Sequence, residues 1–411
     1  MEGSPSSPNW APALVRRNFR IDLFSAIGGG AYVAVLVTFM PVVVRRLGGS
    51  TTDVAIVVAA PFVGHLASPF FSYLLSGFPL VRVVAGAVTL ARATFLVGVL
   101  VATTPLMLAA TTVVVWVIAV ANIGAYTALM HGMYPDQERG QAMANVRIGG
   151  AIAGIAAAVL AGAFIDVVPA AWVFAAVAAI GLPGSLAFFA VRHAGPDVPV
   201  ARRSVAAIAR GVWADHRYLR LLLCFSVFGV GNLMNVAVYP ILLVDHFNAP
   251  NSFVGAMSAV QSATMIAAYL VWGRIIDRGS SIRLTLVNTV VAILVPIAYI
   301  AAPGTWALLP AAAIAGVVTA GGEITFFTNI VQLAPRERIG EYAAAQSLLM
   351  GIRGTAAPFA ASALLGVADA RLVLLIGVLF MTAGAALMAG AVRVPRAAAP
   401  LPAAPAQTPA D

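Results

Sequence analysis

Long apolar runs separated by short polar stretches fill most of the 411-residue chain. Each run is near the ~20 residues that a helix needs to cross a bilayer. The runs are continuous, whereas a β-barrel would show short alternating segments. We therefore expect an all-α integral membrane protein with twelve transmembrane helices. Their predicted bounds are about 21–44, 52–76, 81–103, 105–131, 141–166, 169–191, 219–244, 252–273, 283–302, 305–333, 341–367 and 370–392.

The chain repeats itself at an offset of 200 residues (335 − 135). A charged turn runs from Pro135 to Gly140, and a second runs from Pro335 to Gly340. Six spans in each half give both halves the same orientation, as two parallel repeats related by an axis along the membrane normal. The expected parts are a cytoplasmic segment 1–20, a six-helix half 21–191, a linker 192–217, a second half 218–392 and a disordered tail 393–411.

Composition excludes a soluble protein, because 61% of the residues are apolar and only 9% are charged. A single cysteine excludes a disulfide framework. All 24 basic residues are arginines, and they gather at the ends of the apolar runs. They therefore mark topology rather than a surface for nucleic acid. Eighteen of the 24 lie on one side, which predicts both termini in the cytoplasm of a cell (inner or plasma) membrane.

One loop carries a recognisable motif, Gly273-Arg274-Ile275-Ile276-Asp277-Arg278-Gly279. With the twin charged turns, it resembles the major facilitator superfamily and its Gly-x-x-x-Asp-Arg loop. The resemblance implies alternating access, with spans 1, 4, 7 and 10 lining a central cavity and Asp277 and Arg278 at a cytoplasmic gate. The matching loop of the first half, 76–82, lacks the Asp-Arg pair. The arginine that the family's drug–proton antiporters often carry ahead of a glycine is missing before Gly124, so their motif does not support drug antiport here.

Two opposite charges lie deep in neighbouring spans. Glu323 is about 18 Å and Arg353 about 20 Å from the inner turn at a rise of ~1.5 Å per residue, near the midplane of a ~30 Å core. Such charges cost roughly 2.5–3.5 kcal/mol each, so they are functional candidates. We hypothesise that the two interact, and that Glu323 binds a proton, a cationic substrate or each in turn. A structural ion pair is the alternative.

Polar side chains reach the same level in three other spans, where transporters bind substrate. The alternative is hydrogen bonding between helices, worth about 0.6 kcal/mol on average. The candidates are Asn232, Asn235 and Tyr239 in span seven, Asn122 and Tyr126 in span four, and Gln261 in span eight.

Span one places Tyr32 and Phe39 where span seven places Asn232 and Tyr239. If these aromatic side chains line the cavity rather than pack between helices, the substrate is amphipathic or largely apolar. Asp22 and Arg147 fall near the inner surface, where we expect gate or turn-capping residues. His65 is either a titrating group or a packed one, and Arg92 in span three has no partner evident from the sequence.

We find no P-loop, metal-ligand cluster or nucleophile motif, so we expect neither an enzyme nor a cofactor. The prediction is a monomeric secondary transporter that exports a small amphipathic or apolar compound as a proton-coupled antiporter. Its partners would be that substrate, protons and the lipid bilayer, with no nucleic acid. An uncoupled facilitator or importer, a lipid flippase and a non-transporting sensor or scaffold stay open as alternatives.

Overall fold

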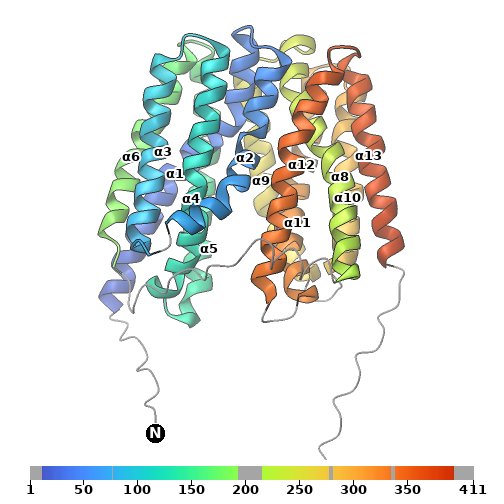
Figure 1. Ribbon diagram of the computed structural model, residues 1–411. Helices are drawn as coiled ribbons and strands as arrows, with labels where there is room; N and C mark the ends of the chain where they lie inside the picture. The colour runs from blue at the N-terminus through green and yellow to red at the C-terminus, as the bar shows by residue number, and fades with distance from the viewer. Residues whose placement is uncertain (1–11, 76, 193–214, 277–280, 335–337, 393–411) are drawn as a thin grey trace, which may run out of the picture.

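A computed structural model describes residues 12–75, 77–192, 215–276, 281–334 and 338–392. Its helices run nearly side by side along one axis, with α1–α6 forming one half and α8–α13 the other (Figure 1). The amino-terminal half contains α1 (Pro12–Arg46), α2 (Thr51–Leu74), α3 (Leu80–Val101), α4 (Pro105–Met133), α5 (Asp136–Ile165), α6 (Ala170–Ala187) and the short helix η1 (Phe188–Ala190).

The carboxy-terminal half has the same layout. It contains α8 (His216–Ile241), the π-helix η2 (Leu242–His246), α9 (Asn251–Ile276), α10 (Ser281–Ala301), the short helix η3 (Thr305–Leu308), α11 (Leu309–Leu333), α12 (Ile339–Leu364) and α13 (Ala370–Val392). Eleven of the described helices are long and apolar enough to cross a membrane. The twelfth, α12, has 26 residues and carries Glu341 and Arg353. The predicted all-α fold of two six-helix repeats is confirmed.

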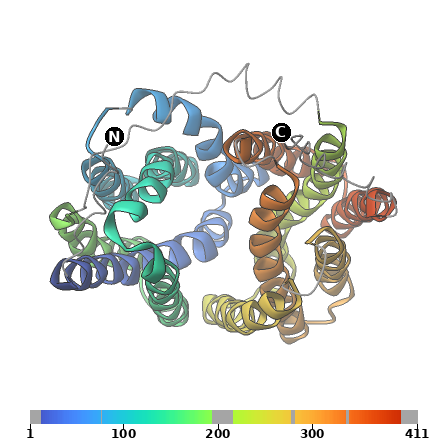
Figure 2. The same cartoon turned by 90° about the horizontal axis from the view of Figure 1, so that it is seen from below.

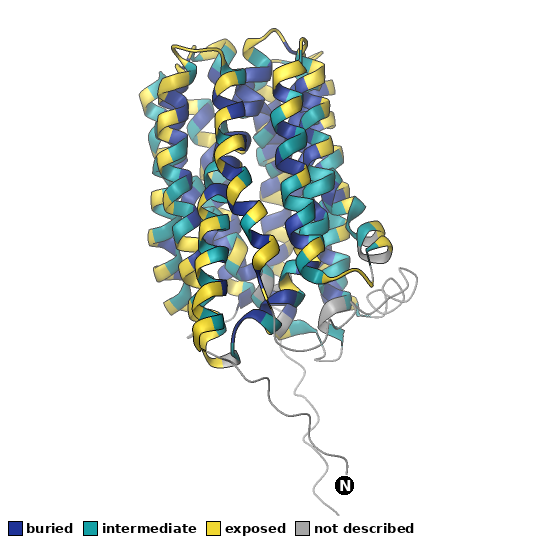
Figure 3. Cartoon of the chain, turned by 90° about the vertical axis from the view of Figure 1, so that its left-hand side faces the viewer, coloured by how far each residue is buried: buried dark blue, intermediate teal, exposed yellow. Residues whose placement is uncertain are grey.

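The side surface of the bundle agrees with a membrane environment. Large apolar side chains point outward along several helices, including Leu379, Ile180 and Val97, which are 68%, 66% and 60% exposed. In Figure 3 such exposed positions alternate with buried ones along the outer helices. A surface of this kind is stable in lipid and not in water.

Several predicted boundaries differ from the structure. α1 begins at Pro12 rather than at residue 21, and the turn predicted at Pro135–Gly140 is the first turn of α5, with Pro135 at its N-cap. A proline is well placed there because the first helical N–H groups have no partner inside the helix. Pro335–Glu337, nearly all of the linker 192–217 and the tail 393–411 lie outside the described residues.

Glycine lets α1 and α5 cross at backbone contact. A Cβ atom at Gly30 would lie 2.0 Å from the carbonyl oxygen of Gly150, and one at Gly154 would lie 3.2 Å from the carbonyl oxygen of Gly30. Small residues commonly allow membrane helices to approach in this way. This crossing fixes α1, which carries Asp22 and Tyr32, against α5, which carries Arg147.

We expect Gly30→Ala to lower the unfolding temperature of the purified protein, because its methyl group has no room and overpacking costs about 1–3 kcal/mol. Gly86→Ala in α3 is the matched control, since no atom lies within 4 Å of the added Cβ. The control should be at least as stable as the wild type, because alanine favours a helix over glycine. Equal unfolding temperatures for the two variants would contradict this account of the crossing.

Candidate functional site

The two halves meet along two helix pairs, α2 with α12 and α5 with α9. Figure 2 shows these pairs at opposite ends of the boundary between the halves. The internal repeat relates them, because α2 corresponds to α9 and α5 to α12. Thr51 hydrogen bonds to Ser362 at 2.9 Å, while the residues equivalent to them, Asn251 and Gly162, also meet. The interface therefore has approximate two-fold symmetry.

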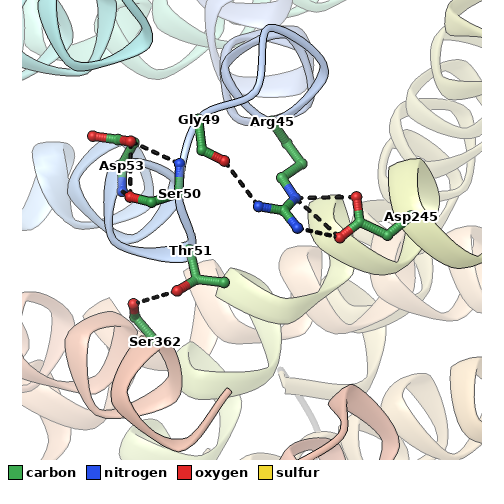
Figure 4. Close-up of polar contacts among 7 residues, drawn as sticks. All are labelled: Arg45, Gly49, Ser50, Thr51, Asp53, Asp245 and Ser362. Carbon is green, nitrogen blue, oxygen red and sulfur yellow. Dashed lines mark hydrogen bonds and ion pairs between the residues drawn. The ribbon is translucent and has the colours of Figure 1, made fainter. Parts of the chain in front are cut away.

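An ion pair joins the two halves on the far face, which we define as the face opposite the ends Pro12 and Val392. Arg45 Nε donates to both carboxylate oxygens of Asp245, at 3.0 Å each, and its Nη1 donates to the carbonyl of Gly49 at 2.8 Å (Figure 4). The side chains are 25% and 40% exposed. A bidentate, partly exposed pair of this kind supplies geometric specificity and a modest free energy.

Asp166 makes a second set of polar contacts between the halves on the same face. Its carboxylate accepts hydrogen bonds from the backbone N–H and the side-chain amide of Asn251 and from the N–H of Ser252, all at 2.9 Å, so it caps α9 from the other half. Partial burial raises the pKa of Asp166, but the hydrogen bonds from Ser252 and Asn251 together lower it by more. The pKa therefore lies below its usual value. The carboxylate is thus ionised at neutral pH.

Asp22 lies inside the amino-terminal half and is buried, 2% exposed. It accepts hydrogen bonds from the hydroxyls of Tyr126, at 3.0 and 3.2 Å, and Tyr134, at 3.0 Å. The structure thus brings together two predicted candidates, Asp22 and Tyr126. Asp22 does not cap a turn, because its partners are the side chains of α4 and of the residue that follows it. Its other expected role, in a gate, stays a prediction.

Arg92 is also buried, 4% exposed, and points into the same half. It donates to the carbonyl of Gly181 in α6, and its guanidinium carbon lies 5.9 Å from the ring centroid of Tyr32. The sequence could not name this partner, because a backbone carbonyl has no residue signature. A cavity of about 420 Å³ between α1, α2, α3, α4 and α6 collects the polar groups Asp22, Tyr32, His65, Arg92, Asn122 and Tyr126.

The two deep charges of the carboxy-terminal half do not pair with each other. Glu323 accepts a hydrogen bond from the hydroxyl of Tyr269 in α9. Arg353 donates to the carbonyl of Phe225 in α8 and lies against Gly229. The predicted Glu323–Arg353 contact is therefore wrong. The reason is packing, since α11 lies mainly against α9 and α10 while α12 lies against α2 and α8.

Two of the three polar residues predicted on α8, Asn235 and Tyr239, contact helices of their own half. Asn235 is fully buried and donates to the sulfur of Met381 in α13 at 3.5 Å. Tyr239 stacks on Tyr299 in α10 with ring centroids 4.2 Å apart. The predicted convergence with Asn122 and Tyr126 is not formed by Asn235. Asn232 and Gln261 are half-buried, and their side chains make no hydrogen bond within the described part of the chain.

Arg147 on α5 lies between the two polar systems. Its side chain lies near Tyr126, the partner of Asp22, and near Tyr269, the partner of Glu323. It is exposed, and its expected role in a gate stays a prediction. Two further predicted gate residues, Asp277 and Arg278, lie outside the described residues.

A second cavity of about 410 Å³ lies between the halves and is almost wholly apolar. Its walls come from α1, α2, α4 and α8, and Tyr239 is among them. Pro61 and Trp116 line both this cavity and the polar one, so the two spaces are neighbours. Within the described ranges, no group of three or more His, Cys, Asp or Glu side chains is placed to hold a metal ion.

Several transporters of known structure share this architecture. A mutant form of the nucleoside transporter NupG has a TM-score of 0.75 and 13% identity, over 91% of this chain and 99% of that one. A bacterial homolog of the human lysosomal transporter Spinster, inward-facing and occupied, has a TM-score of 0.66 and 16% identity, over 94% and 98%. A POT family transporter in complex with 5-aminolevulinic acid has a TM-score of 0.71 and 10% identity, over 95% and 97%. These identities establish a shared fold alone.

No curated protein sequence matches the chain. The family model described as Major Facilitator Superfamily, in contrast, matches it twice, over residues 23–234 and 221–410. The two matches correspond to the two six-helix halves. Because they cover nearly the whole chain, and the fold has the expected twelve helices in two repeats, the protein belongs to the Major Facilitator Superfamily of membrane transporters.

Proposed function

We propose that this transporter exports a small amphipathic or apolar compound by alternating access, in exchange for protons. The observation that carries the proposal is the placement of the contacts between the halves. Among the described residues, every side-chain hydrogen bond that joins the halves comes from the part of the helices nearest the far face, from Arg45–Asp245 down to Thr38–Ser258. With the arginine-rich ends in the cytoplasm, this is a state closed to the outside.

The apolar cavity between the halves supports the substrate class. Its walls include Leu36, Val58, Leu233 and Val236, and a substrate bound there would gain mainly from burial of apolar surface. Its volume of about 410 Å³ lies within the ~300–1,000 Å³ that is usual for small-molecule sites. The stack of Tyr239 on Tyr299 gives that cavity a rigid aromatic wall.

Glu323 is the group through which we propose that protons act. It is exposed on α11 and accepts a hydrogen bond from Tyr269, and the cation Arg147 of the opposite half lies near that same tyrosine. An ionised Glu323 would attract Arg147 and draw the cytoplasmic ends of the halves together. A proton on Glu323 would remove that attraction, so proton release inside favours the outward-facing state and proton binding outside favours the return. This order is the one that proton-driven export requires.

We expect Glu323→Gln to abolish proton movement in proteoliposomes that contain a pH dye and receive a panel of lipophilic cations, antibiotics, sugars, organic acids and lysolipids. The amide cannot exchange a proton, so the wild-type pH change with the transported class should disappear. Glu138→Gln, at an exposed position in the first turn of α5, is the matched control and should behave as the wild type. A pH change that survives Glu323→Gln would place the proton site elsewhere.

We expect Asp245→Asn to open the far face, because it removes one charge of the Arg45–Asp245 pair. An exposed pair is worth up to about 1 kcal/mol, so the ratio of open to closed molecules should rise by at most roughly fivefold. Spin labels at the exposed positions Leu47 and Val367, introduced after Cys224 is replaced, would report the distance between the halves.

The charge exchange Arg45→Asp with Asp245→Arg supplies the control for this prediction. It restores an ion pair at the same place and should return the distance distribution toward that of the wild type. A distribution that is identical in the wild type, the single variant and the double variant would show that the ion pair does not bias the two states.

A further inference from the structure

Arg92 faces a cavity inside the amino-terminal half with donor groups that the protein itself leaves unused. We propose that this cavity binds the carboxylate or phosphate group of an amphipathic organic anion, with Arg92 as its cationic ligand. The inference deepens the proposed function by naming the chemical class of the transported compound, and it rests on that function. The charged group of the ligand would lie within one half, beside the apolar space between the halves.

The first support is the missing counter-charge. Arg92 is 4% exposed in the middle of a membrane helix, and its partners in the described part of the chain are the Gly181 carbonyl and the ring of Tyr32. Neither partner carries a negative charge. A guanidinium has five N–H donors, yet Nε of Arg92 has no acceptor among the described residues. A charge buried in this way is costly until an anion neutralises it.

The second support is an unused donor next to Arg92, whose guanidinium carbon lies 5.9 Å from the ring centroid of Tyr32. The hydroxyl of Tyr32 is buried, belongs to a residue that lines the cavity, and lacks a hydrogen-bond partner among the described residues. A carboxylate or phosphate oxygen accepts from both a guanidinium and a phenol, so it would satisfy Arg92 and Tyr32 together. Gly29 leaves room for the guanidinium of Arg92, since a Cβ there would lie 2.7 Å from Nη2 of Arg92.

Asp22 lies in the same cavity but does not serve as the counter-ion of Arg92. Both of its oxygens accept hydrogen bonds from tyrosine hydroxyls. It is seven residues from Gly29 along α1 (29 − 22), which is about 10 Å at the helical rise. The cavity therefore has an open cationic end at Arg92 and a closed acidic end at Asp22.

The apolar part of the ligand follows from the remaining walls. Val33, Val88, Ala119 and Val120 line the polar cavity, and Pro61 and Trp116 separate it from the apolar cavity that reaches α8. An anion held at Arg92 would extend its apolar body past Trp116 toward Leu233 and Tyr239 of the other half. Such a ligand would contact both halves, and its binding would depend on their relative position.

Direct binding to the purified protein in nanodiscs tests the proposal without requiring transport. The probes are octanoate and octyl phosphate, with octanol and octyltrimethylammonium as the neutral and cationic controls, followed by calorimetry. We expect one or both anions to bind and both controls to fail. Which anion binds distinguishes a carboxylate ligand from a phosphate ligand. Quenching of tryptophan fluorescence by bromo-octanoate, lost in Trp116→Phe, would locate the probe.

The variants separate a ligand role for Arg92 from a structural one. Arg92→Gln keeps hydrogen-bond donors but removes the charge, and it should weaken anion binding by about tenfold or more. Tyr32→Phe keeps the ring that packs on Phe95 and should weaken binding severalfold, which decides the matter if Arg92→Gln fails to fold. Arg82→Gln, at an exposed position on the same helix, is the matched control and should bind as the wild type.

Two results would overturn the inference. One is binding of octanol or octyltrimethylammonium as tight as that of the anions, and the other is anion binding that both folded variants leave unchanged. Failure of the proton assay with intact, Arg92-dependent binding would reject the coupling mechanism and leave this site standing. Proton-coupled transport with no anion binding would reject this site and leave the coupling mechanism standing.

Discussion

The structure depends above all on the cost of placing charge within a membrane, roughly 2.5–3.5 kcal/mol for each group. Four charged side chains within the spans have hydrogen-bond partners nearby. Asp22 is held by two tyrosine hydroxyls, Glu323 by one, and Arg92 and Arg353 by backbone carbonyls of neighbouring helices. Hydrogen bonds satisfy some of the polar atoms without neutralising the charge. These four groups are therefore where binding of a proton or an ion has the largest energetic effect.

The internal repeat explains why the two halves had to diverge. Residues near the axis that relates the repeats meet their own equivalents, so an identical charge in both copies would repel itself. Arg45 and Asp245 are such equivalents, 200 residues apart, and they have opposite charges and pair. Away from the axis each contact occurs twice with different chemistry, as with Thr51–Ser362 and Asn251–Gly162. The backbone architecture is thus shared, whereas the polar chemistry differs from one half to the other.

The same contrast shows what could be predicted from the sequence. Apolar length places the spans, because the bilayer fixes how many residues a helix needs, and arginine content gives the expected orientation. Distance along a helix also gives the depth of Glu323 and Arg353, but not the direction in which each side chain points or which helix it meets. Arg353 in fact donates to the backbone carbonyl of Phe225, and Asn235 donates to the sulfur of Met381. The partners of Arg92 could not be predicted from the sequence, because they are a backbone carbonyl and the face of an aromatic ring.

The two proposed sites can be understood as one electrostatic system. Arg147 lies near Tyr126, which donates to Asp22 in the amino-terminal cavity, and near Tyr269, which donates to Glu323 in the other half. A change of charge on Glu323 would therefore change the force on Arg147, which lies near Tyr126 at the wall of the cavity that contains Arg92. An anion bound at Arg92 and a proton bound at Glu323 both reduce the charge left uncompensated in the bundle, each on its own half. Movement of the carboxy-terminal half relative to Arg147 would then link the occupancy of one site to that of the other, which is the physical requirement for exchange.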